Sequence, residues 1–284
     1  MDRERVLVDR LWMMQPSHCG ADLPQVIPLA VVGGISISCA DVETATEALM
    51  RGAILGHVHL VSAHGVVESQ KNHDLRSVLN SGTALPDGTP LTWVAAATRQ
   101  TTKFQRCYGP DLMRSVLDWG RRSSKSHFLV GGTDDTLPEL VSSITSRWPG
   151  ANVAGAMPLP FRPLTPTEFE HLTSHIGEAQ PDFIWVGIST PKQDFLAAQI
   201  TEATGRTCLA VGAAFDFIRG SQQAAPPAIQ RAGLEWLYRL SREPRRLWQR
   251  YSRVVPIFLM IGARQILRAR LKGSPSRGRP QSGQ

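Results

Sequence analysis

Polar side chains at the start of one helix form the first candidate site. The segment from Pro181 to Asp194 is PDFIWVGISTPKQD, and its apolar run is typical of a strand buried on both faces. Lys192 and Gln193 follow in the first turn of the next helix, where free backbone N–H groups and the helix dipole favour an anion. Lys192 would add positive charge, and Gln193 an amide donor. An anion site and a turn that binds nothing both stay open.

Asp87 is the second candidate, in a Pro86-Asp87-Gly88 turn between a short strand and an apolar helix. An Asp at such a position commonly serves as a turn former or a helix cap. The alternative is a carboxylate held at the carboxyl end of a sheet strand, where ligands bind in open α/β sheets. A carboxylate there could act as a general base and accept the proton of an attacking hydroxyl.

Two further groups of side chains are weaker candidates. Gly131 and Gly132 end a strand and would let a ligand approach the backbone closely, but they do not form a G-x-G-x-x-G fingerprint. His57 and His59 would share one strand face, as a metal pair or as two ordinary histidines at the rim of the sheet. The chain has no D-x-D pair, so the usual ligands of a divalent cation that clamps a nucleotide diphosphate are missing.

The order of the elements predicts an α/β fold that would bring these residues together. Strands and helices alternate at least four times between residues 126 and 216, which is typical of a parallel sheet with helices on both faces. The strands end in loops that contain Asp87, Gly131, Gly187 and Gly212. Because the carboxyl ends of parallel strands meet at one edge, we expect these loops to converge.

The helical segments are predicted from apolar spacing and from proline. One helix is expected over about residues 65–79 and another over 226–240. A basic helix is expected from Arg245 to Val254, and a third from Pro256 to about Leu271, since proline suits the first turn. Apolar residues recur at 4-3-4-3 spacing between the arginines of this region. That pattern fits a helix at a membrane interface or on a partner, or an Arg-rich solvated face.

The composition is that of an ordinary soluble globular protein. The 284 residues are 42% hydrophobic and 19% charged, without a signal peptide or an apolar run of about 20 residues that would span a membrane. The four scattered cysteines indicate reduced thiols, not disulfides or a zinc site. From residue 231 onward thirteen Arg or Lys stand against two Glu, so this end carries +11 and the preceding residues −4 of the net +7. The basic end is expected to meet an anionic partner.

Six segments together resemble the WecG/TagA/CpsF glycosyltransferases (glycosyltransferase family 26), in particular exopolysaccharide-type members. They are LPDGTPLTW at 85–93, RCYGPDLM at 106–113, FLVGGTDD at 128–135, PDFIWVGISTPKQD at 181–194, VGAAFDFIRG at 211–220 and GLEWLYRLSREPRRL at 233–247. They follow the family's order and spacing over roughly residues 28–260, and the last two are the most specific.

The resemblance implies a Rossmann-like fold with a basic C-terminal appendage. The expected parts are an irregular lead-in (1–27), a glycosyltransferase core (28–225), a helical membrane-proximal appendage (226–272) and a disordered tail (273–284). The implied activity is inverting transfer of a hexose or N-acetylhexosamine-type sugar from a UDP-sugar to a polyprenyl-diphosphate-linked saccharide, with no metal or other cofactor, in bacterial cell-surface polysaccharide assembly. The protein would be cytoplasmic, with its basic helices on the anionic inner face of the plasma membrane. Homo-oligomers are possible partners, and nucleic acid is not expected.

The resemblance also implies roles for single residues. Asp87 matches the family's proposed general base, and Arg106, Gln193, Arg239 and Arg246 match residues linked to the donor or its diphosphate. The predicted donor site further includes Gly131, Gly132, Lys192, Gly212 and Asp216.

Two segments depart from the teichoic-acid members. Their T-P-N-A motif is replaced here by Leu60-Val61-Ser62-Ala63-His64, and their G-Y-F by residues 156–161. Both departures resemble exopolysaccharide-type members. His64 would fill part of the acceptor site or play a plain packing role.

Two other classes of protein are alternatives. A nicotinamide-dependent oxidoreductase would need a Gly-rich fingerprint with an acidic residue about 20 positions later, and no segment supplies one. A non-catalytic adaptor that binds a membrane or nucleic acid through the basic end stays open.

Overall fold

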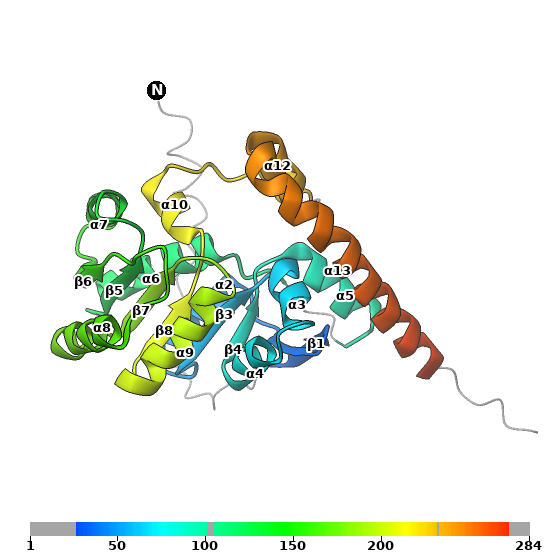
Figure 1. The fold of residues 1–284 in the computed structure, drawn as a ribbon, viewed down its shortest axis with the longest axis horizontal. Coiled ribbons are helices and arrows are strands. Elements are labelled where there is room, and N and C mark those ends of the chain that lie inside the picture. Colours follow the sequence, from blue (N-terminus) through cyan, green and yellow to red (C-terminus); the bar gives the residue numbers. More distant parts are fainter. Residues whose placement is uncertain (1–26, 101–104, 232, 273–284) are drawn as a thin grey trace, which may run out of the picture.

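The protein contains one eight-stranded, mostly parallel sheet with helices on both faces (Figure 1). The computed structural model describes residues 27–100, 105–231 and 233–272. The strand order is β1-β2-β4-β3-β8-β7-β5-β6, and every pair except β1–β2 is parallel. The strands are β1 (Leu29–Val32), β2 (Ile35–Ser38), β3 (His57–Val61), β4 (Thr83–Pro86), β5 (Ser126–Gly131), β6 (Asn152–Met157), β7 (Phe183–Gly187) and β8 (Thr207–Ala210).

The antiparallel edge is a hairpin made possible by two glycines. Gly33 and Gly34 have φ angles of 59° and 85°, a region that side chains other than glycine rarely adopt. A Cβ atom on Gly33 would also lie 2.4 Å from a methyl carbon of Val66. The glycines therefore permit the tight turn that joins β1 to β2.

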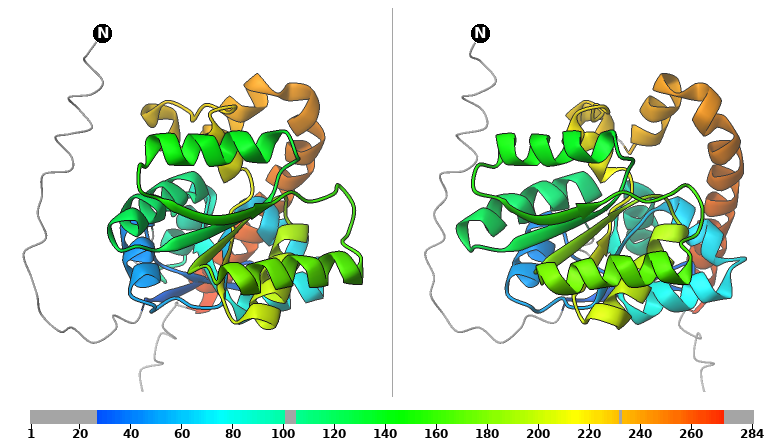
Figure 2. Two further views of the ribbon diagram at one scale, coloured as in Figure 1. Left: turned by 90° about the vertical axis from the view of Figure 1, so that its left-hand side faces the viewer. Right: turned by 60° about the vertical axis from the view of Figure 1, so that its left-hand side comes forward.

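The helices divide between the two faces of the sheet. One face is covered by α2 (Val42–Met50), α6 (Gly109–Arg122), α7 (Thr136–Arg147) and α10 (Ala214–Arg219). The other is covered by α3 (Ala63–Ser69), α4 (His73–Ser81), α5 (Thr89–Ala97), α8 (Pro166–Ala179) and α9 (Lys192–Thr204). Figure 2 shows α7 and α8 on opposite sides of the sheet. Along β7, Trp185 packs toward the first face and Val186 toward the second, which explains the continuous apolar run.

Three helix predictions are wrong in their boundaries. The helix expected over residues 65–79 is two helices, because Asn72 accepts a hydrogen bond from the Leu75 amide and starts α4. The helix expected over 226–240 is split into α11 (Pro227–Arg231) and α12 (Glu235–Arg242), and Gly233 between them has a φ angle of 68°.

The third correction concerns the C-terminal helices. Residues Pro244–Lys272 form the single helix α13, and Pro256 lies inside it. Val254 and Phe258, on either side of the proline, are buried in the cluster that packs α13 on α3 and α5, so packing holds the helix together across the missing backbone donor. Figure 1 shows α13 passing over α3 and α5.

Some expectations fall outside the described residues. They are the lead-in up to residue 26 and the tail from residue 273. None of the helices within the described ranges combines the length and apolarity needed to cross a bilayer.

Candidate active site

A cavity of about 1720 Å³ lies at the carboxyl edge of the parallel strands. Its walls come from the loops after β3, β4, β5, β6, β7 and β8, and from helices that include α5, α9, α12 and α13. The predicted site residues that line it are Asp87, Arg106, Gly132, Lys192, Gln193, Gly212, Asp216, Arg239 and His64. The predicted convergence of the loops is confirmed.

Asp87 is held rigidly where β4 ends. Its backbone N–H donates to the Val61 carbonyl oxygen at 2.9 Å, and its Oδ1 accepts from the Gly109 amide at 3.0 Å. Burial raises the pKa of Asp87 to about 6, although the Gly109 hydrogen bond and the Arg106 charge act in the opposite direction. The carboxylate can therefore be ionised at neutral pH while remaining a far better proton acceptor than an exposed aspartate.

Arg106 links this turn to the C-terminal helices. Its Nε donates to the Asp87 carbonyl oxygen at 3.2 Å, and its Nη2 lies 2.6 Å from Glu235 Oε2. The guanidinium also stacks on Tyr108, with 3.9 Å between its central carbon and the ring centre. Glu235 was not predicted as a site residue, because only the fold brings α12 next to the loop after β4. The only indication in the sequence was that Glu235 lies within the GLEWLYR segment, which is part of the resemblance to the family.

The start of α9 differs from the anion-binding site that the sequence predicts. The Gln193 amide donates to Ser189 O at 3.2 Å and the Asp194 amide to Pro191 O at 3.1 Å, so these two donors are already engaged. The Gln193 side chain is buried, and its Nε2 donates to Thr190 Oγ1 at 3.3 Å. Its Oε1 has no hydrogen-bond partner among the described residues and lies beside Gly212. Lys192 lines the cavity and can supply charge there.

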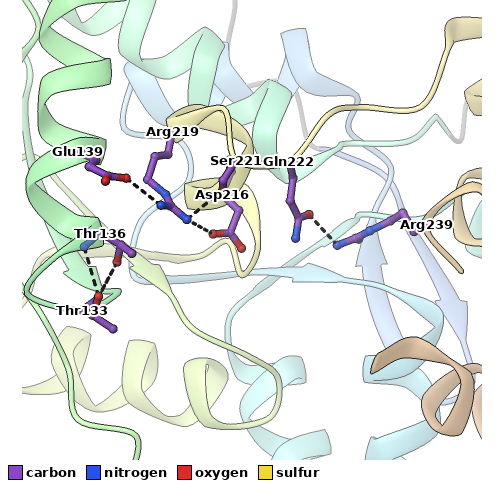
Figure 3. Close-up of polar contacts among 8 residues, drawn as sticks. All are labelled: Thr133, Thr136, Glu139, Asp216, Arg219, Ser221, Gln222 and Arg239. Atoms are coloured by element: carbon purple, nitrogen blue, oxygen red, sulfur yellow. Dashed lines mark hydrogen bonds and ion pairs between the residues drawn. The ribbon is translucent and has the colours of Figure 1, made fainter. Parts of the chain in front are cut away.

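The two glycines at the end of β5, Gly131 and Gly132, have different surroundings. Gly132 lines the cavity, whereas Gly131 does not. A Cβ atom on Gly131 would lie 2.8 Å from the Gly187 carbonyl oxygen, so this glycine permits close packing of β5 against β7. The next residues form a reciprocal cap in which the Thr133 amide donates to Thr136 Oγ1 and the Thr136 amide to Thr133 Oγ1 (Figure 3).

Charged residues beyond β8 continue the wall of the cavity. Arg219 Nη2 donates to Asp216 Oδ1 at 3.4 Å, and Arg219 Nη1 lies 2.8 Å from Glu139 Oε2. Arg239 Nη2 donates to Gln222 Oε1 at 3.3 Å (Figure 3). The Arg239 guanidinium also lies 5.6 Å from the centre of the Phe217 ring. Arg219 and Arg239 thus bring two more guanidinium groups to the same cavity.

His64 of α3 also lines this cavity. Its Nε2 lies 3.6 Å from Glu68 Oε1, and its buried Nδ1 has no hydrogen-bond partner in the described part of the chain. Burial, followed by the positive charge of Arg250, lowers the pKa of His64 to about 4, so the ring is neutral. The side chain of Arg246 lies outside the described residues.

His57 and His59 are not two rim histidines. His59 is completely buried, with Nδ1 2.9 Å from Asp194 Oδ1 and Nε2 2.7 Å from His57 Nδ1. Across residues 27–100, 105–231 and 233–272, no group of three or more His, Cys, Asp or Glu side chains could hold a metal ion. The pair instead ties β3 to the first turn of α9.

Comparison with known proteins agrees with this geometry. The model of the family described as "Glycosyl transferase WecG/TagA/CpsF family" matches residues 30–272, so the chain belongs to this family of glycosyltransferases. It is similar to the N-acetylglucosaminyldiphosphoundecaprenol N-acetyl-beta-D-mannosaminyltransferase of Bacillus subtilis (strain 168), with 26% identity over 200 residues. The match covers 70% of this chain and 75% of that relative.

Proposed function

We propose that this glycosyltransferase moves a hexose or N-acetylhexosamine-type sugar from a UDP-sugar to a polyprenyl-diphosphate-linked saccharide. The family match supports sugar transfer. The name of the Bacillus relative supports an acceptor with N-acetylglucosamine on a polyprenyl diphosphate. The product would be an intermediate of a bacterial cell-surface polysaccharide.

Asp87 is the proposed general base. A hydroxyl oxygen of the acceptor saccharide attacks the anomeric carbon of the donor sugar, and its proton passes to the Asp87 carboxylate. The bond between the anomeric carbon and the diphosphate oxygen breaks on the opposite side, so UDP leaves and the configuration inverts. The observation that carries this role is the half-buried carboxylate at the cavity wall, fixed by the Gly109 amide and with a pKa raised to about 6.

Cationic side chains are proposed to neutralise the leaving diphosphate. Arg106, Arg239 and Lys192 all line the cavity that contains Asp87. Guanidinium groups form paired, charge-assisted hydrogen bonds with phosphate oxygens, and such donors stabilise charge that develops as the bond breaks. Transfer without a divalent cation follows as a prediction.

The C-terminal helix is proposed to hold the enzyme at an anionic membrane surface. Large apolar side chains on α13 are exposed, namely Trp248, Leu259, Met260, Leu267 and Leu271. Basic residues stand between them, and each adds about 1 kcal/mol of attraction near anionic lipid. This arrangement would place the cavity beside the lipid-linked acceptor on the cytoplasmic face.

The experiment has two parts. A set of UDP-sugars is first screened for thermal stabilisation of the protein, since a ligand that binds only the folded state raises its melting temperature. Each stabilising sugar is then incubated with N-acetylglucosaminyl-diphospho-undecaprenol, and UDP release and glycosylated lipid are measured. The proposal predicts both products in equal amounts. Absence of transfer from every UDP-sugar that binds would contradict it.

A further inference from the structure

The part of the cavity that is lined by α5 and α13 is apolar, and we call it the apolar arm. On α5 its walls are Trp93, Val94 and Ala97, and on α13 they are Val254, Val255, Phe258, Leu259, Gly262, Ala263 and Ile266. The α13 positions are neighbouring pairs that recur every four residues, so they form one helix face. Apart from Arg250, the described residues of α5 and α13 that line the cavity are all uncharged.

The arm begins at the proposed reaction centre. Gly88 caps α5 directly after Asp87, so α5 leads outward from the general base. At the same end, Arg250 lines the cavity. After burial, its positive charge is the next influence that lowers the pKa of His64. From Arg250 to Ile266 the helix rises about 24 Å at 1.5 Å per residue. The cavity therefore has positive charge near Arg250 and an apolar lining that continues from there along α13 to Ile266.

The arm has a closed floor and an open side. A Cβ atom on Gly262 would lie 3.0 Å from a methyl carbon of Val94, so α13 and α5 come close together at this level. By contrast, Trp93 and Leu259 are 52% and 64% exposed. Exposed apolar side chains along a groove mark a place for an apolar ligand.

We infer that this arm binds the isoprenoid chain of the polyprenyl-diphosphate acceptor, an inference that rests on the proposed function. The diphosphate lies at the cationic end near Arg250, and the chain attached to it follows the apolar walls toward the end of α13. The acceptor saccharide is thereby directed toward Asp87. A ligand with one doubly charged group and one long hydrocarbon chain matches this sequence of surfaces.

The rest of the cavity offers a less suitable path. A second arm lies between the loop after β6 and α9, and its lining mixes apolar side chains such as Phe161 and Leu164 with Arg162, Glu202 and Gln199. Charged and amide side chains would lose water when covered by hydrocarbon, which is costly. The second arm therefore provides a control position within the same cavity.

The test compares two acceptors that share one headgroup. N-acetylglucosaminyl-diphospho-undecaprenol is assayed in detergent beside the same headgroup carrying a single isoprene unit. Ala97→Phe and Ala263→Phe each place a ring in the apolar arm at an exposed position, and Ala203→Phe places the same ring in the second arm. For the first two variants, the KM of the long-chain acceptor should rise about tenfold relative to that of the short one, a loss equal to about two buried CH₂ groups. Ala203→Phe should keep the wild-type ratio.

Several results would overturn the inference. One is an equal change for both acceptors, and another is a selective loss in Ala203→Phe. Binding to anionic phospholipid vesicles without acceptor is measured in parallel and should be unchanged. If vesicle binding falls together with transfer, the groove contacts the bilayer instead of the acceptor. Failure of the proposed function looks different, because the wild-type protein would then glycosylate neither acceptor.

Discussion

Arg106 and Glu235 form an ion pair at the wall of the cavity, with Nη2 and Oε2 2.6 Å apart and side chains only 15% and 14% exposed. The same guanidinium donates to the Asp87 carbonyl oxygen. Because Glu235 belongs to α12, the C-terminal helices contribute a charge to the surroundings of Asp87. Glu235 raises the pKa of Asp87 and Arg106 lowers it, although burial is the largest influence.

Replacing Glu235 should therefore change the acid side of the pH–rate profile. In Glu235→Gln the negative charge near Asp87 is lost, so ionisation of Asp87 becomes easier and its pKa falls. We expect the midpoint of the acid limb of kcat/KM to move to lower pH. Glu139→Gln is the control, because Glu139 pairs with Arg219 and does not act on Asp87. A midpoint that stays in place or moves upward would refute this coupling.

The wild-type enzyme should lose activity as the pH falls through about 6. Asp87 accepts a proton only when ionised, and its raised pKa places half-protonation near that pH. The rate should be nearly independent of pH on the neutral side and fall tenfold per unit on the acid side. The measurement is kcat/KM for sugar transfer from pH 4.5 to 8. A plateau that extends below pH 5 would be incompatible with Asp87 as the titrating base.

Arg239 should contribute to the affinity for UDP. It lines the cavity from α12 with its guanidinium held by Gln222, and a hydrogen bond to a charged group contributes about 1.5–3 kcal/mol. Arg239→Ala should weaken UDP binding about 10- to 100-fold in calorimetry. Arg245→Ala removes an exposed arginine outside this cavity and should have little effect. Equal losses in both variants would mean that net charge, not position, determines the affinity.

Chelation tests the proposed role of the cationic side chains. If arginine and lysine neutralise the leaving diphosphate, transfer should continue at its full rate after treatment with EDTA and removal of the chelated metal. The measurement is the initial rate of UDP release, with and without added Mg²⁺ or Mn²⁺. A rate that collapses with EDTA and returns only with a divalent cation would show that the cationic side chains are insufficient.

The sheet could be predicted from the sequence because its signals are local. Runs such as Phe183–Val186 are apolar at every position, and the strands end at glycine or at Asp87, so the shared edge followed from strand–helix alternation. The helix boundaries were less predictable. Pro256 usually marks a first turn, but burial of Val254 and Phe258 keeps α13 continuous around it.

Long-range contacts within the site could not be predicted in the same way. The ion pair of Arg106 with Glu235 joins segments far apart in the sequence, and neither segment signals the other. His59 shows the same limit, because its burial depends on Asp194 reaching it from α9. Sequence identifies which residues lie near the cavity edge, while the partners that set their charge and orientation come from tertiary packing.

The most direct measurement of the central claim is sugar transfer by Asp87→Asn. The amide oxygen of asparagine can still accept the Gly109 hydrogen bond, so the turn should be retained. We predict that kcat falls by about 10²- to 10⁴-fold while the Kd for UDP is unchanged, since the variant lacks only the proton acceptor. Transfer at the wild-type rate by a variant that binds UDP normally would contradict the account.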